Sequence, residues 1–330
     1  MNNWEFLSEL EALKVKVYKA LCDSSIRLED TFEYAIFFNS SEERTLEYQK
    51  VLGEKSIENV LLVDFKNDSC LFKEKNLRKN LDYLTIISQN KPKVLGDLDI
   101  FNYESNLETI LNEVPSNLSK CFIEITGVPL LYSIAILRPL LLSFPSPSLY
   151  FLNVSANYDN GGNKNYQFSD GLKENIYIPG YYGRPDFSKP WIYIFLLGFE
   201  GTRSISILKQ NQPDYIKAII AEPGYQNDYN TKAIEINKAF LSEAHICNNE
   251  IIRIDAGNPV EICNCIIDIY NDFKEDANIC LVPLGTKPHA LGAGMAALLR
   301  TDIAIMYQVP KRYSINNTKS GKYLWLYKFN

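Results

Sequence analysis

Short apolar runs alternate with polar turns and helix-like segments along the chain. In the first half the expected strands and helices are Tyr34–Phe38, Glu42–Leu52, Asn59–Asp64, Asp82–Ile87, Asn106–Asn112, Cys121–Ile125, Pro129–Leu142 and Leu149–Val154. Runs without polar alternation are typical of strands that helices cover on both faces. The alternation therefore predicts an α/β fold with a doubly wound parallel sheet.

The pattern recurs with an offset of 159 residues. Three pairs of residues keep this offset, namely Arg44 with Arg203, Leu61 with Ile220, and Pro129 with Pro288. The alternative explanation is that any two α/β domains have similarly spaced apolar runs. Turn chemistry recurs as well as the apolar runs, and this favours a duplication. We therefore predict two tandem Rossmann-like halves, related by internal duplication as a pseudo-two-fold pair.

The expected organisation is an N-terminal helix over 1–29, a first half over 30–189 with a hairpin excursion, and a second half over 190–330 with a basic C-terminal tail. The amphipathic N-terminus carries acidic residues and lacks the basic region of a signal peptide. The longest apolar run, 130–144, contains an arginine and a proline and is too short to span a bilayer.

Composition narrows the choice of function. The chain has 330 residues, 46% of them hydrophobic, which is enough for a full-sized core. Its net charge of -6 argues against a general nucleic-acid coat. The last 28 residues carry +5 and the remainder -11, so a local anion site stays open.

Cysteine and histidine usage points away from metal binding. The seven cysteines form no CxxC pair and the chain has only two histidines, which disfavours a structural zinc site. We expect no cofactor, and reduced thiols in a cytoplasmic protein. Cys121 and Cys280 are predicted to lie in buried strands.

A first candidate site follows the first strand of each half. Ligands of open parallel sheets bind outside the carboxyl ends of the strands. In the second half Gly198 and Gly201 permit a tight turn, and Arg203 can bind a carboxylate or phosphate with two hydrogen bonds. Alternatively, Arg203 forms a structural ion pair with Glu200, and Arg44 does so with Glu43. The candidate ligand-binding residues of this motif are Gly198, Phe199, Glu200 and Arg203, with Asn39, Ser40 and Arg44 in the first half.

A second candidate site is the segment Gly285–His289. The Thr286 hydroxyl, the Lys287 ammonium and backbone N–H groups converge there at a strand-to-helix junction, a combination that suits a phosphate. The weaker counterpart in the first half contains Thr126 and Gly127 but no lysine.

The alternatives for this segment are structural. Threonines 126 and 286 can cap their helices, Lys287 can be a solvated turn residue, and His289 a core or capping residue. The dinucleotide fingerprint, the P-loop and the nucleophile elbow are all absent from the sequence.

The strand ending in Gly-Thr-Lys-Pro with its small-residue helix, 285–297, resembles the ligand-facing motif of CARF (CRISPR-associated Rossmann fold) domains. The turn Gly198–Arg203 resembles the other motif of that family, whose members sense cyclic oligoadenylates in bacterial antiviral systems. The resemblance covers 190–310, and 30–155 only through the repeat. It implies a ligand site shared by two domains across a two-fold axis, which a fused duplication supplies in one chain. The missing lysine of the first half implies an asymmetric site or a degenerate half.

These observations lead to one hypothesis and two alternatives. We expect a sensor subunit that binds a nucleotide-type, possibly cyclic, anionic ligand between the two halves and signals to a separate effector protein. A membrane and general nucleic-acid binding are not expected. One alternative is a ring nuclease with Thr286, Lys287, Arg203 and His289 as candidates. The other is a docking subunit that uses the tyrosine-rich segments 158–182 and 307–327.

Overall fold

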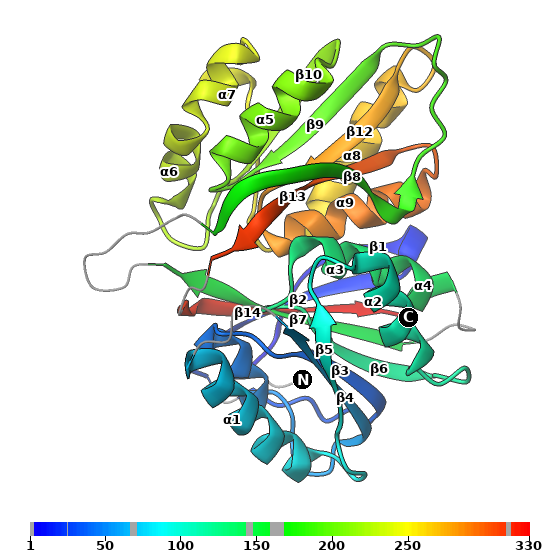
Figure 1. Cartoon of the computed structure of the whole chain (residues 1–330), viewed down its shortest axis with the longest axis vertical. Coiled ribbons are helices and arrows are strands. Elements are labelled where there is room, and N and C mark those ends of the chain that lie inside the picture. Colours follow the sequence, from blue (N-terminus) through cyan, green and yellow to red (C-terminus); the bar gives the residue numbers. More distant parts are fainter. Residues whose placement is uncertain (1–2, 25, 67–70, 143–147, 159–167, 315–317) are drawn as a thin grey trace. The chain divides into compact units, whose positions relative to one another are not determined.

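The computed structural model describes residues 3–24, 26–66, 71–142, 148–158, 168–314 and 318–330. The chain divides into two compact units (Figure 1). The first unit comprises 1–132, 139–164 and 315–330, and the second comprises 133–138 and 165–314. Both units are built of α/β structure, as the sequence predicts.

The first unit contains an eight-stranded, mostly parallel sheet in the order β1-β2-β14-β7-β6-β3-β4-β5. Strands β3 to β7 are parallel to their neighbours among themselves, whereas β1, β2 and β14 pair antiparallel. The strands are β1 (Glu5–Leu10), β2 (Val15–Leu21), β3 (Phe32–Phe38), β4 (Ile57–Lys66), β5 (Lys93–Asp99), β6 (Lys120–Glu124), β7 (Ser148–Asn157) and β14 (Lys319–Phe329). The helical elements that accompany them are η1 (Glu11–Leu13), η2 (Glu43–Lys50), α1 (Leu71–Ile87) and α2 (Tyr103–Asn112). Helices α3 (Leu130–Ala135) and α4 (Leu137–Leu142) are divided between the units, because 133–138 belong to the second.

The second unit contains a six-stranded sheet in the order β11-β10-β9-β12-β13-β8, in which only β8 is antiparallel to its neighbour. Its strands are β8 (Ser169–Tyr182), β9 (Trp191–Leu197), β10 (Tyr215–Ala221), β11 (Ile252–Ile254), β12 (Asn278–Pro283) and β13 (Ala304–Tyr313). Its helices are α5 (Gly201–Asn211), α6 (Tyr229–Ile236), α7 (Lys238–Glu243), η3 (Asn248–Glu250), α8 (Pro259–Phe273) and α9 (Lys287–Leu299).

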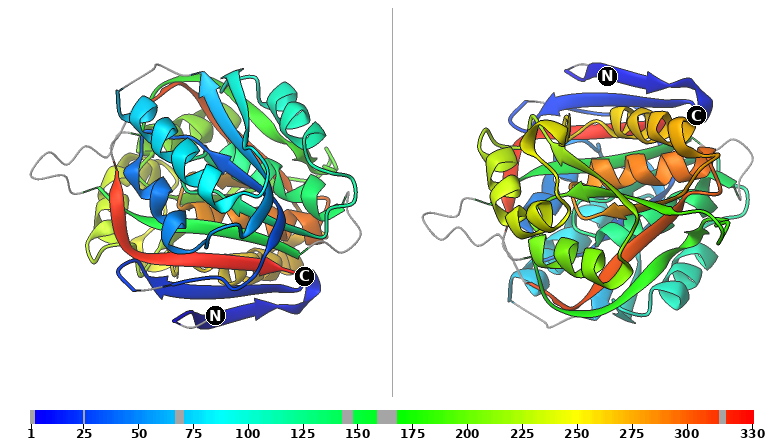
Figure 2. Two further views of the ribbon diagram at one scale, coloured as in Figure 1. Left: turned by 90° about the horizontal axis from the view of Figure 1, so that it is seen from below. Right: turned by 90° about the horizontal axis from the view of Figure 1, so that it is seen from above.

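Helices cover both faces of the second sheet. The core on one face joins β9, β10, β12 and β13 to apolar residues of α5, α6 and α7, and the other face carries α8 and α9 (Figure 2). Burial on both faces explains why the strands read as continuous apolar runs. Cys280 in β12 is fully buried, as is Cys121 in β6, which confirms the placement predicted for both thiols.

The predicted N-terminal helix is wrong, because residues 5–21 form an antiparallel hairpin of β1 and β2. Lys14 adopts a left-handed conformation with φ 50° between the two strands, which stops helical propagation. Val15 and Val17 are fully buried while Lys16 is not. This period of two favours a strand over the helical periodicity that the same segment also carries.

The chain path exchanges one strand between the two units. Strand β8 follows β7 in sequence but pairs with β13 of the second sheet, and β14 follows β13 but lies between β2 and β7 of the first (Figure 1). The second unit therefore includes β8, upstream of the expected boundary at residue 190. The expected basic tail of the second half is instead a strand of the first unit. Residues 159–167 of the expected hairpin excursion lie outside the described part of the chain.

No helix among the described residues is long and apolar enough to cross a membrane.

Candidate functional site

The two motifs of the second unit lie side by side at the carboxyl ends of β9 and β12. These strands are neighbours, and the strand order changes direction between them, a place that we call the switch point. A Cβ atom added to Gly198 would lie 2.5 Å from the Leu284 carbonyl oxygen and 3.0 Å from the Gly285 Cα. The two loops therefore touch backbone to backbone, where open α/β sheets bind ligands.

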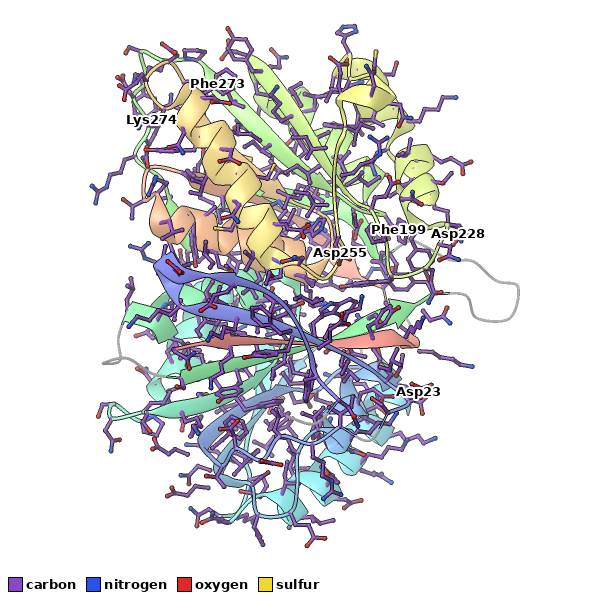
Figure 3. All side chains as sticks on the ribbon, turned by 180° about the vertical axis from the view of Figure 1, so that it is seen from behind. Asp23, Phe199, Asp228, Asp255, Phe273 and Lys274 are labelled. Atoms are coloured by element: carbon purple, nitrogen blue, oxygen red, sulfur yellow. The ribbon has the colours of Figure 1, made fainter. Side chains whose placement is uncertain are left out.

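Three labelled residues mark this end of the second sheet in Figure 3. Phe199, Asp228 and Asp255 follow β9, β10 and β11 and lie at one end of the unit, whereas Phe273 and Lys274 lie at the other. The half-buried Phe199 ring stacks on Phe168, with ring centres 6.1 Å apart, and meets the edge of Tyr229 at 5.3 Å. These three rings form an aromatic cluster at the loop that follows β9.

Arg203 is buried and bound within the unit. Its Nη2 donates to the carbonyl oxygen of Gln308 in β13, and its Nη1 lies 3.5 Å from Glu200 Oε1. Glu200 Oε2 accepts a hydrogen bond from the Ser169 hydroxyl at 2.8 Å. Burial raises the pKa of Glu200 despite the opposing effect of Arg203. The ion-pair alternative is therefore the arrangement observed, and ligand binding by this guanidinium stays a prediction.

In the second motif, Thr286 and His289 form hydrogen bonds within the fold, whereas Lys287 is partly exposed. Thr286 is the N-cap of α9, because its Oγ1 accepts the His289 N–H at 3.2 Å, and it donates to the Ala256 carbonyl at 2.8 Å. His289 is fully buried, with Nε2 3.0 Å from the Asp255 carbonyl oxygen. Burial lowers its pKa to about 4, so the ring is neutral at pH 7. Lys287, the first helical residue, remains partly exposed.

Gly201 has a packing role. A Cβ atom there would lie 2.2 Å from the Ile236 carbonyl oxygen, at the end of α6. Its missing side chain is needed for the approach of two helices and not for a ligand.

In the first unit, hydrogen bonds of asparagine side chains hold the loop that follows β3. Asn39 Nδ2 donates to Asp64 Oδ1 at 2.9 Å, and Asn39 Oδ1 accepts from Asn80 at 3.2 Å. The Ser40 carbonyl accepts from Asn76 Nδ2 at 2.9 Å. These polar groups are consequently engaged with one another at the carboxyl ends of β3 and β4.

Arg44 occupies the same kind of position as Arg203. Its guanidinium donates to the Val154 carbonyl in β7 at 2.5 Å and to the Thr126 carbonyl at 3.4 Å. The expected partner Glu43 is wrong, because the ion pair is with Glu42, at 2.5 Å. Glu43 instead faces a lysine of α1.

Side chains fill the space around the second motif of the first unit, residues 126–127. Thr126 Oγ1 accepts the N–H of Val154 at 3.1 Å and is fully buried, so it does not cap a helix. A Cβ atom on Gly127 would lie 2.6 Å from both Ser40 Cβ and Thr45 Cγ2. The loops that follow β3 and β6 therefore meet through side chains.

Sequence reasoning missed the residues that hold the second unit's loop. Asn237, fully buried, donates to the Gly198 carbonyl at 2.7 Å and accepts from the Ser204 hydroxyl at 2.8 Å. Phe168, Ser169 and Tyr229 complete the surroundings. Each lies far along the chain from its contact, and an isolated asparagine or serine gives no local signal of such a role.

A shallow pocket occurs elsewhere in the second unit, at the amino ends of β12 and β13. Its charged lining consists of Arg184, Asp186, Lys189, Lys274 and Asp302. It lies at the opposite end of the sheet from both motifs and mixes the two signs of charge.

Within the described ranges no three histidine, cysteine or carboxylate side chains gather as metal ligands would. No protein-family model matches the sequence, and a search of the curated proteins finds no match either.

Proposed function

We propose that this chain is a CARF-like sensor subunit of a bacterial antiviral system. It binds a nucleotide-type anionic ligand at the switch point of its second unit and passes that state to a separate effector protein. The proposal rests on the resemblance of the two motifs and on the strand arrangement that brings them together.

The strand orders support the internal duplication. Numbered by their order along the chain, β5-β4-β3-β6-β7 and β11-β10-β9-β12-β13 both read 3-2-1-4-5, the order of doubly wound dinucleotide-binding sheets. Strands β3 and β9 begin and end 159 residues apart. The next strand in each sheet, β14 or β8, is antiparallel to the last strand of the series, and the first sheet continues beyond β14 with β2 and β1. We therefore propose that both units are Rossmann-like copies of one ancestor.

The observation that carries the ligand proposal is the backbone contact between Gly198 and Gly285. It sets Phe199 and the N-terminus of the 13-residue α9 at the same switch point. The dipole of a helix N-terminus favours an anion, and Lys287 adds a positive charge at the first helical residue. Aromatic rings stack on bases without regard to sequence. A phosphate and a base together are the features of a nucleotide.

The test is a thermal-shift screen of cyclic oligoadenylates and mononucleotides, with mass spectrometry of any ligand that copurifies. A ligand at 100 times its Kd stabilises the fold by about 2.7 kcal/mol. We expect a stabilising ligand whose affinity falls at least about tenfold in Lys287→Ala, the loss of one charge-assisted contact. Lys274→Ala, an exposed lysine at the far end of the unit, is the matched control.

A folded protein that no nucleotide stabilises would contradict the sensor proposal and leave the docking-subunit alternative. The ring-nuclease alternative gains no support from the contacts of its candidate residues. Thr286 caps α9, Arg203 is bound to backbone and carboxylate, and His289 is buried and neutral. Recovery of a linearised ligand after incubation would revive it.

A further inference from the structure

The start of the exchanged strand β8 contacts the candidate loop of the second unit, which connects β9 to α5. The Ser169 hydroxyl donates to Glu200 at 2.8 Å, and the ring of Phe168, one residue earlier, stacks on Phe199. Both contacts are made to the loop between β9 and α5. The chain that enters them has just left β7 of the first unit.

The start of the exchanged strand β14 contacts η2, the corresponding element of the first unit. The Thr318 carbonyl oxygen accepts the N–H of Arg44 at 3.4 Å, and the Ser320 hydroxyl donates to Glu47 at 2.6 Å. Arg44 and Glu47 belong to η2, which follows β3 as α5 follows β9. The chain that enters these contacts has just left β13 of the second unit.

The two arginines connect the same elements to the departing strands. Arg203 of α5 binds the Gln308 carbonyl in β13, the strand that leads to β14. Arg44 of η2 binds the Val154 carbonyl in β7, the strand that leads to β8. Each arginine element thus contacts both the strand that leaves its unit and the strand that enters it.

These contacts form a closed circuit with the covalent chain. From α5 the path runs through β13 to β14, from β14 to η2, from η2 through β7 to β8, and from β8 back to the loop before α5. The hydrogen-bonded links join buried arginines to backbone carbonyls within each unit. The two links between the units are the covalent segments 159–167 and 315–317, which lie outside the described residues. A change in one unit would reach the other through these two segments.

We propose that the exchanged strands couple the two units, so that a change in the β9–α5 loop alters the local stability of η2 in the first unit. Resting on the proposed function, this names the route by which ligand occupancy in the second unit reaches the first. The structural element that responds is η2 with the start of β14.

The test is hydrogen exchange of the full chain, which needs no ligand. Glu200→Gln weakens the pairing with Arg203, and Ser169→Ala removes the contact of β8 as a milder second variant. We expect exchange over residues 43–50 to become about fivefold faster in each, the factor that corresponds to one lost hydrogen bond. Ser206→Ala, on α5 but outside the circuit, should leave that segment unchanged.

The covalent links are tested by lengthening both connections, within 159–167 and 315–317, by about ten Gly and Ser residues. In that background Glu200→Gln should speed exchange in the second unit alone. If exchange over 43–50 stays unchanged in the original background, or responds equally with long connections, the coupling proposal is overturned.

A second arm separates this proposal from the sensor proposal. Cyclic oligoadenylate that stabilises the protein without slowing exchange over 43–50 would contradict the coupling and leave the sensor intact. Coupling in the variants without binding of any nucleotide would contradict the sensor and leave the coupling intact.

Discussion

The first sheet changes direction between β3 and β6, as the second does between β9 and β12. These two switch points share a strand order, but different groups fill the space at each. In the first unit Gly127 meets the side chains of Ser40 and Thr45, and amides hold the neighbouring loop. In the second unit Gly198 meets the backbone at Leu284 and Gly285. Side chains thus occupy the space in the first unit, whereas the second unit brings two backbones together.

The helices that follow differ as well. The second unit continues from its loop into α9, 13 residues long, with Lys287 in the first turn. The first unit continues into α3, only 6 residues long, with no lysine before it. A short helix has a small dipole and few aligned N–H groups. If the protein holds the anion site proposed above, this comparison places it in the second unit.

The largest loss of stability from a single substitution is expected at the two glycines. Gly198→Ala places a methyl group against the Leu284 carbonyl oxygen in the loop after β12, and we expect it to lower the free energy of unfolding by about 3 kcal/mol or more. Gly127→Ala meets side chains, and a loss of about 2 kcal/mol is expected. Urea denaturation monitored by circular dichroism measures both.

Rescue distinguishes the two cases. Ser40→Gly removes two of the three nearest atoms from the methyl group at position 127 and should restore part of the stability of Gly127→Ala. It should not help Gly198→Ala. Equal losses with no rescue would mean that the two switch points are closed alike.

The contribution of histidine to the pH dependence of stability should belong to the second unit. Histidine occurs only at positions 245 and 289, both in that unit. His289 titrates near pH 4 when folded and near 6.5 when unfolded, so the unfolded state binds more protons below pH 6.5. Stability is complete above that pH and falls as pH drops toward 4, by about 3 kcal/mol.

Hydrogen exchange at pH 7 and pH 4.5 should show this loss in β12 and not in β6. His289→Gln should remove the pH-dependent part, and the exposed His245→Gln should retain it. A loss shared equally by both units would assign the acid sensitivity to carboxylates.

The smallest expected losses of stability concern two threonines. Thr126→Ala leaves the buried N–H of Val154 without its acceptor, which should cost about 2 kcal/mol. Thr286→Ala removes an N-cap, for about 1 kcal/mol. Serine at either position should retain most of the stability. The same chemical denaturation measures each, and a larger loss at position 286 would reverse the assignment.

Much of the sheet framework was accessible from sequence, because buried parallel strands leave continuous apolar runs such as those in β3, β9 and β12. Strand β5 was missed since most of its residues are exposed and it lacks such a run. The predicted segment Asp82–Ile87 is the end of α1, and the helix expected at Glu42–Leu52 is the shorter 3₁₀ helix η2. The exchange of β8 and β14 has no local signature, because pairing partners are chosen by tertiary contacts.

For the candidate site, the sequence predicted where the residues lie in the fold better than it predicted what they contact. Turn chemistry located Gly198 and Gly285 at strand ends, and the sheet order brings them together. Arg203 carries a charge that suggests a ligand, yet its acceptor is the backbone of Gln308, more than a hundred residues away. A backbone carbonyl is present at every residue, so no pattern in the sequence could reveal that partner.

The position of β14 has a consequence for synthesis on the ribosome. Domains generally fold from the N-terminus as they emerge, but the first sheet here needs strand β14, which spans residues 319–329. The second sheet has all of its strands once residue 313 has been translated. The unit that is translated first is therefore completed last, because β2 and β7 lack their shared neighbour until residue 329 has been translated.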